Sequence, residues 1–196
     1  MTGRKKWMAL PPISLLVFLS GCGTFGKVNQ GRVIGFDRER GLVTFIEDSN
    51  YREPGKPRYD VLPPLTIRIP EDRQAMGPAP QAGKLMLLDT QNRKLVFFDA
   101  ATQTFQTISY TLIEQRDNIF KDDARIAGAK FPIVDRVKKT IAVYLPGQRQ
   151  LVTFSVPDEY FALPDDTWRA GDEIRYYYKD PGQALRLMNI SRTDLT

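Results

Sequence analysis

Few residues in this chain belong to the types that most often do chemistry. The sequence has 196 residues, no histidine and one cysteine, Cys22. A serine or cysteine nucleophile usually works with a histidine, structural zinc is held by cysteines and histidines, and haem iron is commonly held by histidine. A disulfide needs a second cysteine. The composition argues against these classes, and the sequence predicts no cofactor and no metal.

Adjacent carboxylates occur four times, at Glu71-Asp72, Asp122-Asp123, Asp158-Glu159 and Asp165-Asp166. Paired acids hydrolyse glycosides when they stand about 5 to 9 Å apart across a cleft. Neighbouring residues on a strand point to opposite faces, so adjacent acids do not provide this geometry. Their spacing also lacks the alternation and central glycine of a calcium loop. We expect solvated turn acids and no enzymatic activity, with a carboxylate-based hydrolase as the least favoured alternative.

Aromatic residues are the remaining candidates for a binding surface. On a strand, Tyr176 and Tyr178 share one face, and exposed rings beside an arginine can stack on sugars or bases. An ordinary strand of high β propensity also explains this tyrosine run, and is favoured. Trp168 precedes a glycine turn, where burial at the end of a barrel is favoured over ligand binding. Tyr51, in a long loop, is the fourth candidate.

The cysteine stands at the end of an export-signal pattern. Arg4, Lys5 and Lys6 precede an uncharged stretch over residues 7–21, as in a secretory signal. That stretch is shorter than the roughly twenty residues of a transmembrane helix. Its end, Leu19-Ser20-Gly21-Cys22, resembles the lipobox of bacterial lipoproteins. The resemblance implies cleavage between Gly21 and Cys22 and a lipid such as palmitate on Cys22.

The lipobox resemblance also implies a location. In lipoproteins an aspartate after the cysteine retains the protein at the inner membrane, and here that residue is Gly23. We therefore expect a periplasm-facing protein anchored in the outer membrane, with the inner membrane as the alternative. The net charge of the sequence is +5, and three of its positive residues lie in the predicted signal peptide. Export and interspersed surface charges argue against nucleic acid as a partner.

Short apolar runs separated by Gly, Pro, Asp and Asn predict an all-β protein. The expected strands are 32–36, 41–47, 64–69, 84–89, 94–98, 104–113, 131–135, 140–145, 150–156, 173–178 and 184–190. Helical spacing is confined to short stretches such as 158–163.

Similar features follow in the same order in both halves, which suggests an internal duplication. Segments 66–72 and 153–159 each contain the end of a strand followed by proline and two acids, and Gly83 and Gly171 each precede a strand. We expect two tandem small modules, barrel-like or sandwich-like, of the SH3-like or OB-like kind. The predicted division is 1–21 signal peptide, 22–30 lipidated tether, 31–113 first module, 114–130 connection and 131–196 second module.

The function predicted from these features is association. We expect a non-catalytic lipoprotein that binds or scaffolds an envelope protein, through strand edges and loops. The Pro- and Gly-rich loops at 48–64 and 76–83 are the first candidate surfaces in the first half. The alternative is a glycan- or peptidoglycan-binding lipoprotein that uses its Tyr and Trp side chains as platforms.

Overall fold

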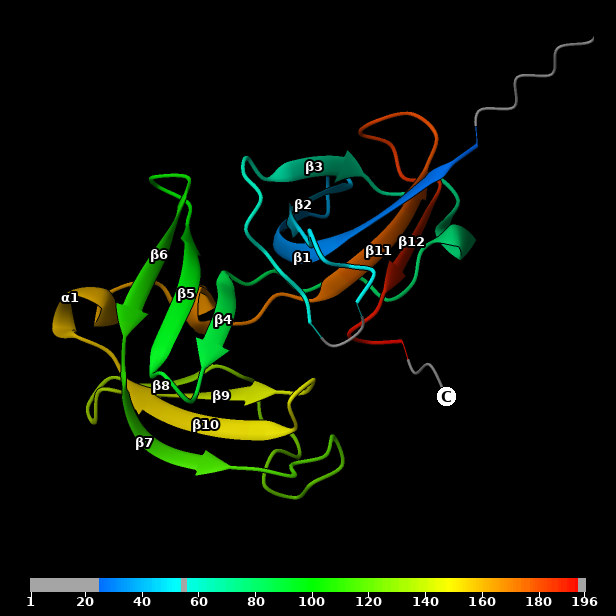
Figure 1. The fold of residues 1–196 in the computed structure, drawn as a ribbon. Coiled ribbons are helices and arrows are strands. Elements are labelled where there is room, and N and C mark those ends of the chain that lie inside the picture. The colour runs from blue at the N-terminus through cyan, green and yellow to red at the C-terminus, as the bar shows by residue number, and fades with distance from the viewer. Residues whose placement is uncertain (1–24, 54–55, 194–196) are drawn as a thin grey trace, which may run out of the picture.

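The computed structural model describes residues 25–53 and 56–193 and shows an all-β protein built from antiparallel sheets, as predicted (Figure 1). One short helix, α1 (Asp158–Phe161), and two 3-10 turns, Arg73–Ala75 and Asp165–Trp168, complete it. The strands are β1 (Lys27–Asp37), β2 (Leu42–Glu47), β3 (Leu65–Arg68), β4 (Leu85–Asp89), β5 (Lys94–Asp99), β6 (Thr104–Ser109), β7 (Thr111–Arg116), β8 (Ile133–Asp135), β9 (Thr140–Leu145), β10 (Gln150–Ser155), β11 (Glu173–Tyr178) and β12 (Arg186–Asn189).

Most strands of the structure lie within the ranges predicted from the sequence. Two segments differ from the prediction. The expected strand 104–113 is two strands, β6 and β7, which meet at Tyr110 and belong to different sheets. The prediction that residues 22–30 form a tether is wrong for residues 27–30, which belong to a strand. Lys27 begins β1, and residues 27–30 pair with Tyr178 to Arg175 of β11. Polar composition hid this strand from the sequence pattern, although Asn29 and Gln30 are buried.

The five-stranded sheet has the order β12-β11-β1-β2-β3, so it joins the two ends of the chain (Figure 1). We call this part, β1–β3 with β11 and β12, the terminal lobe. Backbone bonds also link β3 to the segment before β12: Arg68 N–H donates to Gly182 O at 2.8 Å, and Ala184 N–H donates to Arg68 O at 2.9 Å. The lobe thereby closes around a core of Val33, Val43, Phe45, Ile67, Ile174, Tyr176, Ala184 and Leu187.

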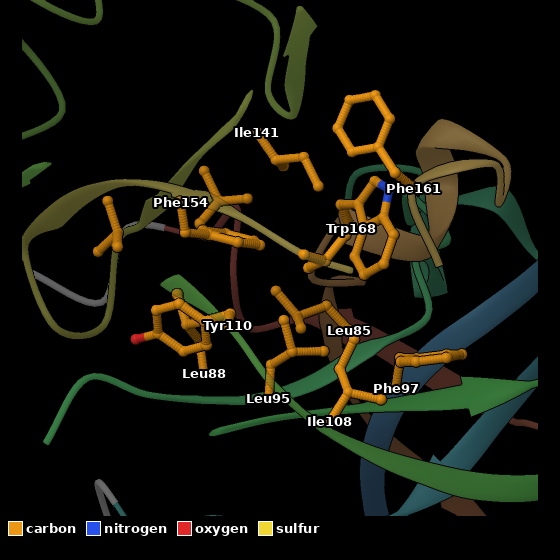
Figure 2. Close-up of a cluster of buried hydrophobic side chains, with 13 residues drawn as sticks. Leu85, Leu88, Leu95, Phe97, Ile108, Tyr110, Ile141, Phe154, Phe161 and Trp168 are labelled. Atoms are coloured by element: carbon orange, nitrogen blue, oxygen red, sulfur yellow. The ribbon is translucent and has the colours of Figure 1, made fainter. Parts of the chain in front are cut away.

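The remaining strands form the inserted lobe, which comprises β4–β10. It contains a three-stranded sheet, β4-β5-β6, and a four-stranded sheet, β7-β10-β9-β8. Figure 2 shows side chains from both sheets converging on one apolar core with Trp168 and Phe161. The alternating apolar pattern of these strands supplies that core, because every second residue faces inward.

The predicted tandem division at 31–113 and 131–196 is therefore wrong. Strands of the second predicted module, β11 and β12, complete the sheet begun by β1 and β2. The predicted connection 114–130 starts inside β7 and lies within the inserted lobe. Its Ile119 is buried there, and the carbonyl of Ile119 accepts a bond from the Tyr144 hydroxyl. The duplication itself stays a prediction.

A smaller apolar cluster holds the two lobes together. Its buried members are Ile46 and Tyr59 from the terminal lobe and Met86 and Phe98 from the inserted lobe. Tyr59 belongs to the loop between β2 and β3, which was expected to be a partner-binding loop. In the structure, Tyr59 of this loop is buried in the contact between the lobes.

Candidate functional site

Trp168 lies in the core of the inserted lobe and not on a surface. Its side chain is fully buried, and its ring meets the ring of Phe97 edge-on, with the centroids 5.8 Å apart. The favoured interpretation of a core tryptophan is confirmed. A role as a sugar platform is wrong, because a stacked ligand needs an exposed ring face.

The tyrosine candidates likewise do not form a binding surface together. Tyr176 is 5% exposed and packs edge-on against Phe45. Its other side is stacked on Tyr178, at 5.1 Å between ring centroids. Burial, together with the nearby Tyr178, raises the pKa of Tyr176 to about 12. Tyr51 is half-buried, beside the Arg52 guanidinium at 5.6 Å.

The paired acids take part in separate surface ion pairs. Asp158 contacts Lys139 at 2.7 Å, and Asp166 contacts Lys84 at 3.1 Å. Asp165 pairs with Arg136, and the side chains of these three acids are all at least 45% exposed. Within the described residues, no three His, Cys, Asp or Glu side chains converge as a metal site would require. Each of these three acids therefore faces a basic side chain, whereas a glycoside hydrolase needs two carboxylates that face one substrate.

Two shallow depressions lie on the inserted lobe. One, of about 330 Å³, is lined by Phe120, Lys121, Asp122, Tyr144, Pro146 and Arg149. The other, of about 300 Å³, lies at the bend between β6 and β7. The first contains one carboxylate, Asp122, and the second contains none, so neither holds the pair of carboxylates that a glycoside hydrolase needs.

A polar cluster that the sequence patterns did not indicate lies between the lobes. The Arg32 guanidinium reaches from β1 to β4, where it donates to Leu85 O at 3.2 Å and Met86 O at 2.7 Å. It lies 4.3 Å from the centre of the Tyr59 ring, in cation–π geometry. Burial raises the pKa of Tyr59, and within the described residues its hydroxyl has no hydrogen-bond partner.

The same cluster continues along β1 and β11. Gln30 donates to Glu173 and, at 3.4 Å, to Asp48, and it accepts two bonds from Arg175. Asp48 is 1% exposed, and its Oδ1 accepts the N–H groups of Asn50 and Arg58. These bonds fix the start of the loop that carries Tyr59. The bonds from Arg32 to Leu85 O and Met86 O extend this cluster from the terminal lobe to the inserted lobe.

Several sheet edges are covered by neighbouring segments. Beside β4, Lys84 N–H donates to Asp166 O and Leu85 N–H to Arg169 O. Beside β12, Gly77 N–H donates to Leu187 O at 2.8 Å. Residues 182–184 are bonded to β3, so neighbouring segments occupy the edges of β3 and β12 and the start of the edge of β4.

The three other edge strands differ in how well they could accept a new strand. β7 contains a register shift opposite Thr153 and Phe154 and carries the ion pair of Glu114 with Arg116. β8 has only three residues. Bulges, charges and short length are the features by which proteins block edge pairing.

β6 has none of these protective features. Its sequence, TFQTIS, has no charge and no proline, and all six residues pair with β5 without a register shift. Among the described residues, no other strand pairs with it. Ile108 faces the core, while Thr104, Thr107 and Ser109 are exposed. This regular, uncharged edge is the best candidate for binding an extended peptide.

The predicted lipidation residue, Cys22, and the predicted cleavage site before it lie outside the described residues. Within residues 25–53 and 56–193, no helix has the length and apolar character needed to cross a bilayer.

Comparison with known proteins gives one match. A family model described as "Domain of unknown function (DUF4881)" matches residues 24–196. No curated protein and no solved structure matches the chain. The matched span begins two residues after Cys22 and includes both lobes.

Proposed function

The chain belongs to the DUF4881 family, and we propose that it is a non-catalytic envelope lipoprotein that is anchored through Cys22 and binds an extended segment of a partner protein at β6. The anchor rests on the signal pattern and on the lipobox resemblance of Leu19-Ser20-Gly21-Cys22. The outer membrane, facing the periplasm, is its proposed location, because Gly23 and not aspartate follows the cysteine.

The observation that carries the binding function is the free edge of β6. A strand edge presents alternating N–H and C=O groups, which a partner strand satisfies by adding to the sheet. Natural proteins protect such edges against unwanted pairing. In this protein β7 and β8 have protective features, and β3 and β12 are bonded to neighbouring segments. β4 is bonded at its first residue and has a register shift. Among the described residues, none of this protects the six regular residues of β6.

The carboxylates and aromatic rings support association better than catalysis or sugar binding. The acids at 158–159 and 165–166 lie on the surface, and three of them are paired with Lys or Arg. Trp168 and Tyr176 are buried.

The anchor is tested with Cys22→Ser. The variant should lose incorporation of labelled palmitate and leave the membrane fraction, or accumulate unprocessed. Palmitate that still enters the Cys22→Ser chain would show that the lipid is attached elsewhere.

The β6 edge is tested by photo-cross-linking in cells that carry the full chain. A cross-linking residue at Thr107, which is exposed on β6, should give a discrete adduct with an envelope protein. Thr107→Lys places a charge on this edge and should abolish co-purification of that protein. Thr111→Lys, on the bulged edge strand β7, is the matched control.

Two outcomes would contradict this function. Co-purification that survives Thr107→Lys and is lost with Thr111→Lys would move the binding edge to β7. Absence of any reproducible adduct from residue 107 would contradict protein binding at β6.

A further inference from the structure

Exposed apolar and aromatic side chains gather at the end of the terminal lobe where β1 begins. Phe25 is 96% exposed and Val28 is 45% exposed. Val28 is paired with Tyr177, and Tyr177 with Arg186. Directly opposite residues on antiparallel strands share a face, so these three side chains form a row across β1, β11 and β12.

Basic side chains lie at the same end of the lobe as this row, Lys27 on the opposite face of the sheet. Lys27 begins β1 opposite Tyr178, and Lys179 follows Tyr178 directly. Lys27, Lys179 and Arg186 are all exposed, and Asp180 is the nearest carboxylate along the chain. The surface thus combines apolar groups with a local excess of positive charge, which suits an anionic phospholipid surface.

The position of Cys22 identifies what lies against this surface. Lys27 is five residues beyond Cys22, and a fully extended chain of that length spans about 17 Å. A compact chain of this size has a radius of gyration of about 15 Å. The folded part therefore cannot move more than about its own radius from a lipid on Cys22.

We propose that this end of the terminal lobe rests on the phospholipid surface in which the chain is anchored. We call it the membrane-facing end and define it by Phe25, Lys27, Val28, Tyr177, Lys179 and Arg186. The inference rests on the proposed lipidation of Cys22. Figure 1 shows the inserted lobe on the opposite side of the molecule from the start of β1. Contact at the membrane-facing end therefore holds the inserted lobe, with β6, away from the bilayer.

Lipid contact is measured with fluorescent labels on the full-length product, after its acylation by the host has been verified by mass. Cys22 is the only cysteine in the sequence, so once it is acylated a new cysteine is the single labelling site. Labels at Val28→Cys and Arg186→Cys are compared with one at Val137→Cys, which is 93% exposed on the inserted lobe. Each protein is reconstituted in vesicles of phosphatidylethanolamine and phosphatidylglycerol that contain brominated lipid.

Brominated lipid should quench the labels at residues 28 and 186 at least several-fold more strongly than the label at residue 137. Lys27→Glu with Lys179→Glu should reduce quenching at residue 28. Lys130→Glu with Lys138→Glu, two exposed cations of the inserted lobe, is the matched control and should leave it unchanged.

Different results would contradict the lipid anchor on Cys22 and the contact of the membrane-facing end with lipid. Equal quenching at residues 28 and 137 in acylated protein that floats with the vesicles would overturn the membrane contact and leave the anchor intact. A purified chain without acyl groups would overturn both.

Discussion

Gly83 and Gly171 lie against each other where the chain passes from the terminal lobe to the inserted lobe and back. A Cβ added to Gly83 would come within 2.8 Å of Gly171 N, and one added to Gly171 would overlap the Val33 carbonyl oxygen. Gly83 N–H donates to that same carbonyl at 3.1 Å. In the sequence, Gly83 and Gly171 occupy matching positions in the two halves. In the structure they are neighbours, at the place where two segments of the backbone cross in close contact.

Gly171→Ala should destabilise the protein by more than about 2 kcal/mol, because its methyl group would collide with backbone atoms that cannot rotate away. The free energy of unfolding in urea measures the effect. Gly147→Ala is the matched control, since nothing lies within 4 Å of a Cβ at that position. Equal stability of the two variants would mean that the crossing is looser than described.

Arg32→Ala should cost about 1 to 3 kcal/mol of unfolding free energy, because the buried carbonyls of Leu85 and Met86 lose their charged donor. Arg38→Ala, at an exposed arginine near the Phe36 ring, should change stability by less than about 0.5 kcal/mol. Urea unfolding compares the two. If Arg38→Ala lowered the unfolding free energy as much as Arg32→Ala, the bonds of Arg32 between the lobes would not account for the loss.

Tyr59→Phe should leave stability at neutral pH unchanged or slightly higher, because the lost hydroxyl is buried without a partner. Burial raises the Tyr59 pKa in the folded state above its unfolded value of about 10. The stabilising contribution of the protonated phenol is therefore complete below about pH 10 and declines as the pH rises further.

The pH dependence of unfolding separates ionisation of Tyr59 from ionisation of the other tyrosines. The unfolding free energy of the wild type should fall above pH ~10, and that of Tyr59→Phe should fall less steeply. Tyr51→Phe, in the same loop, controls for removal of one phenol. Identical slopes for the wild type and Tyr59→Phe would contradict the assignment.

Trp168→Ala should destabilise the inserted lobe by about 3 to 5 kcal/mol, since it removes a fully buried indole from the main core. Trp168→Phe should cost less, because the ring contact with Phe97 is partly kept. Apart from Trp7 in the predicted signal, Trp168 is the only tryptophan. Its fluorescence in the wild type therefore follows unfolding of the inserted lobe, while circular dichroism follows both variants.

The sequence predicted strands and turns better than it predicted the proposed binding edge. Asp99 shows why turns are visible: its carboxylate accepts Ala101 N–H at 2.9 Å, a local bond that depends on nearby residues only. The segment that became β6 was recognised as a strand, but its position at a sheet edge could not be read from its own residues. Arg32 was missed because a charged residue within a strand usually faces solvent.

What the sequence determined by itself was the all-β class, the positions of most strands and the absence of histidine and of a second cysteine. Alternation and turn chemistry act over a few residues, so they can be read locally. The tertiary structure alone decided that β1 pairs with β11, which brings Gln30 and Arg175 together across 145 residues of sequence. That pairing depends on how the whole chain buries its apolar faces, and it sets the division into lobes. The tertiary structure also decided that, among the described residues, β5 is the one strand that pairs with β6.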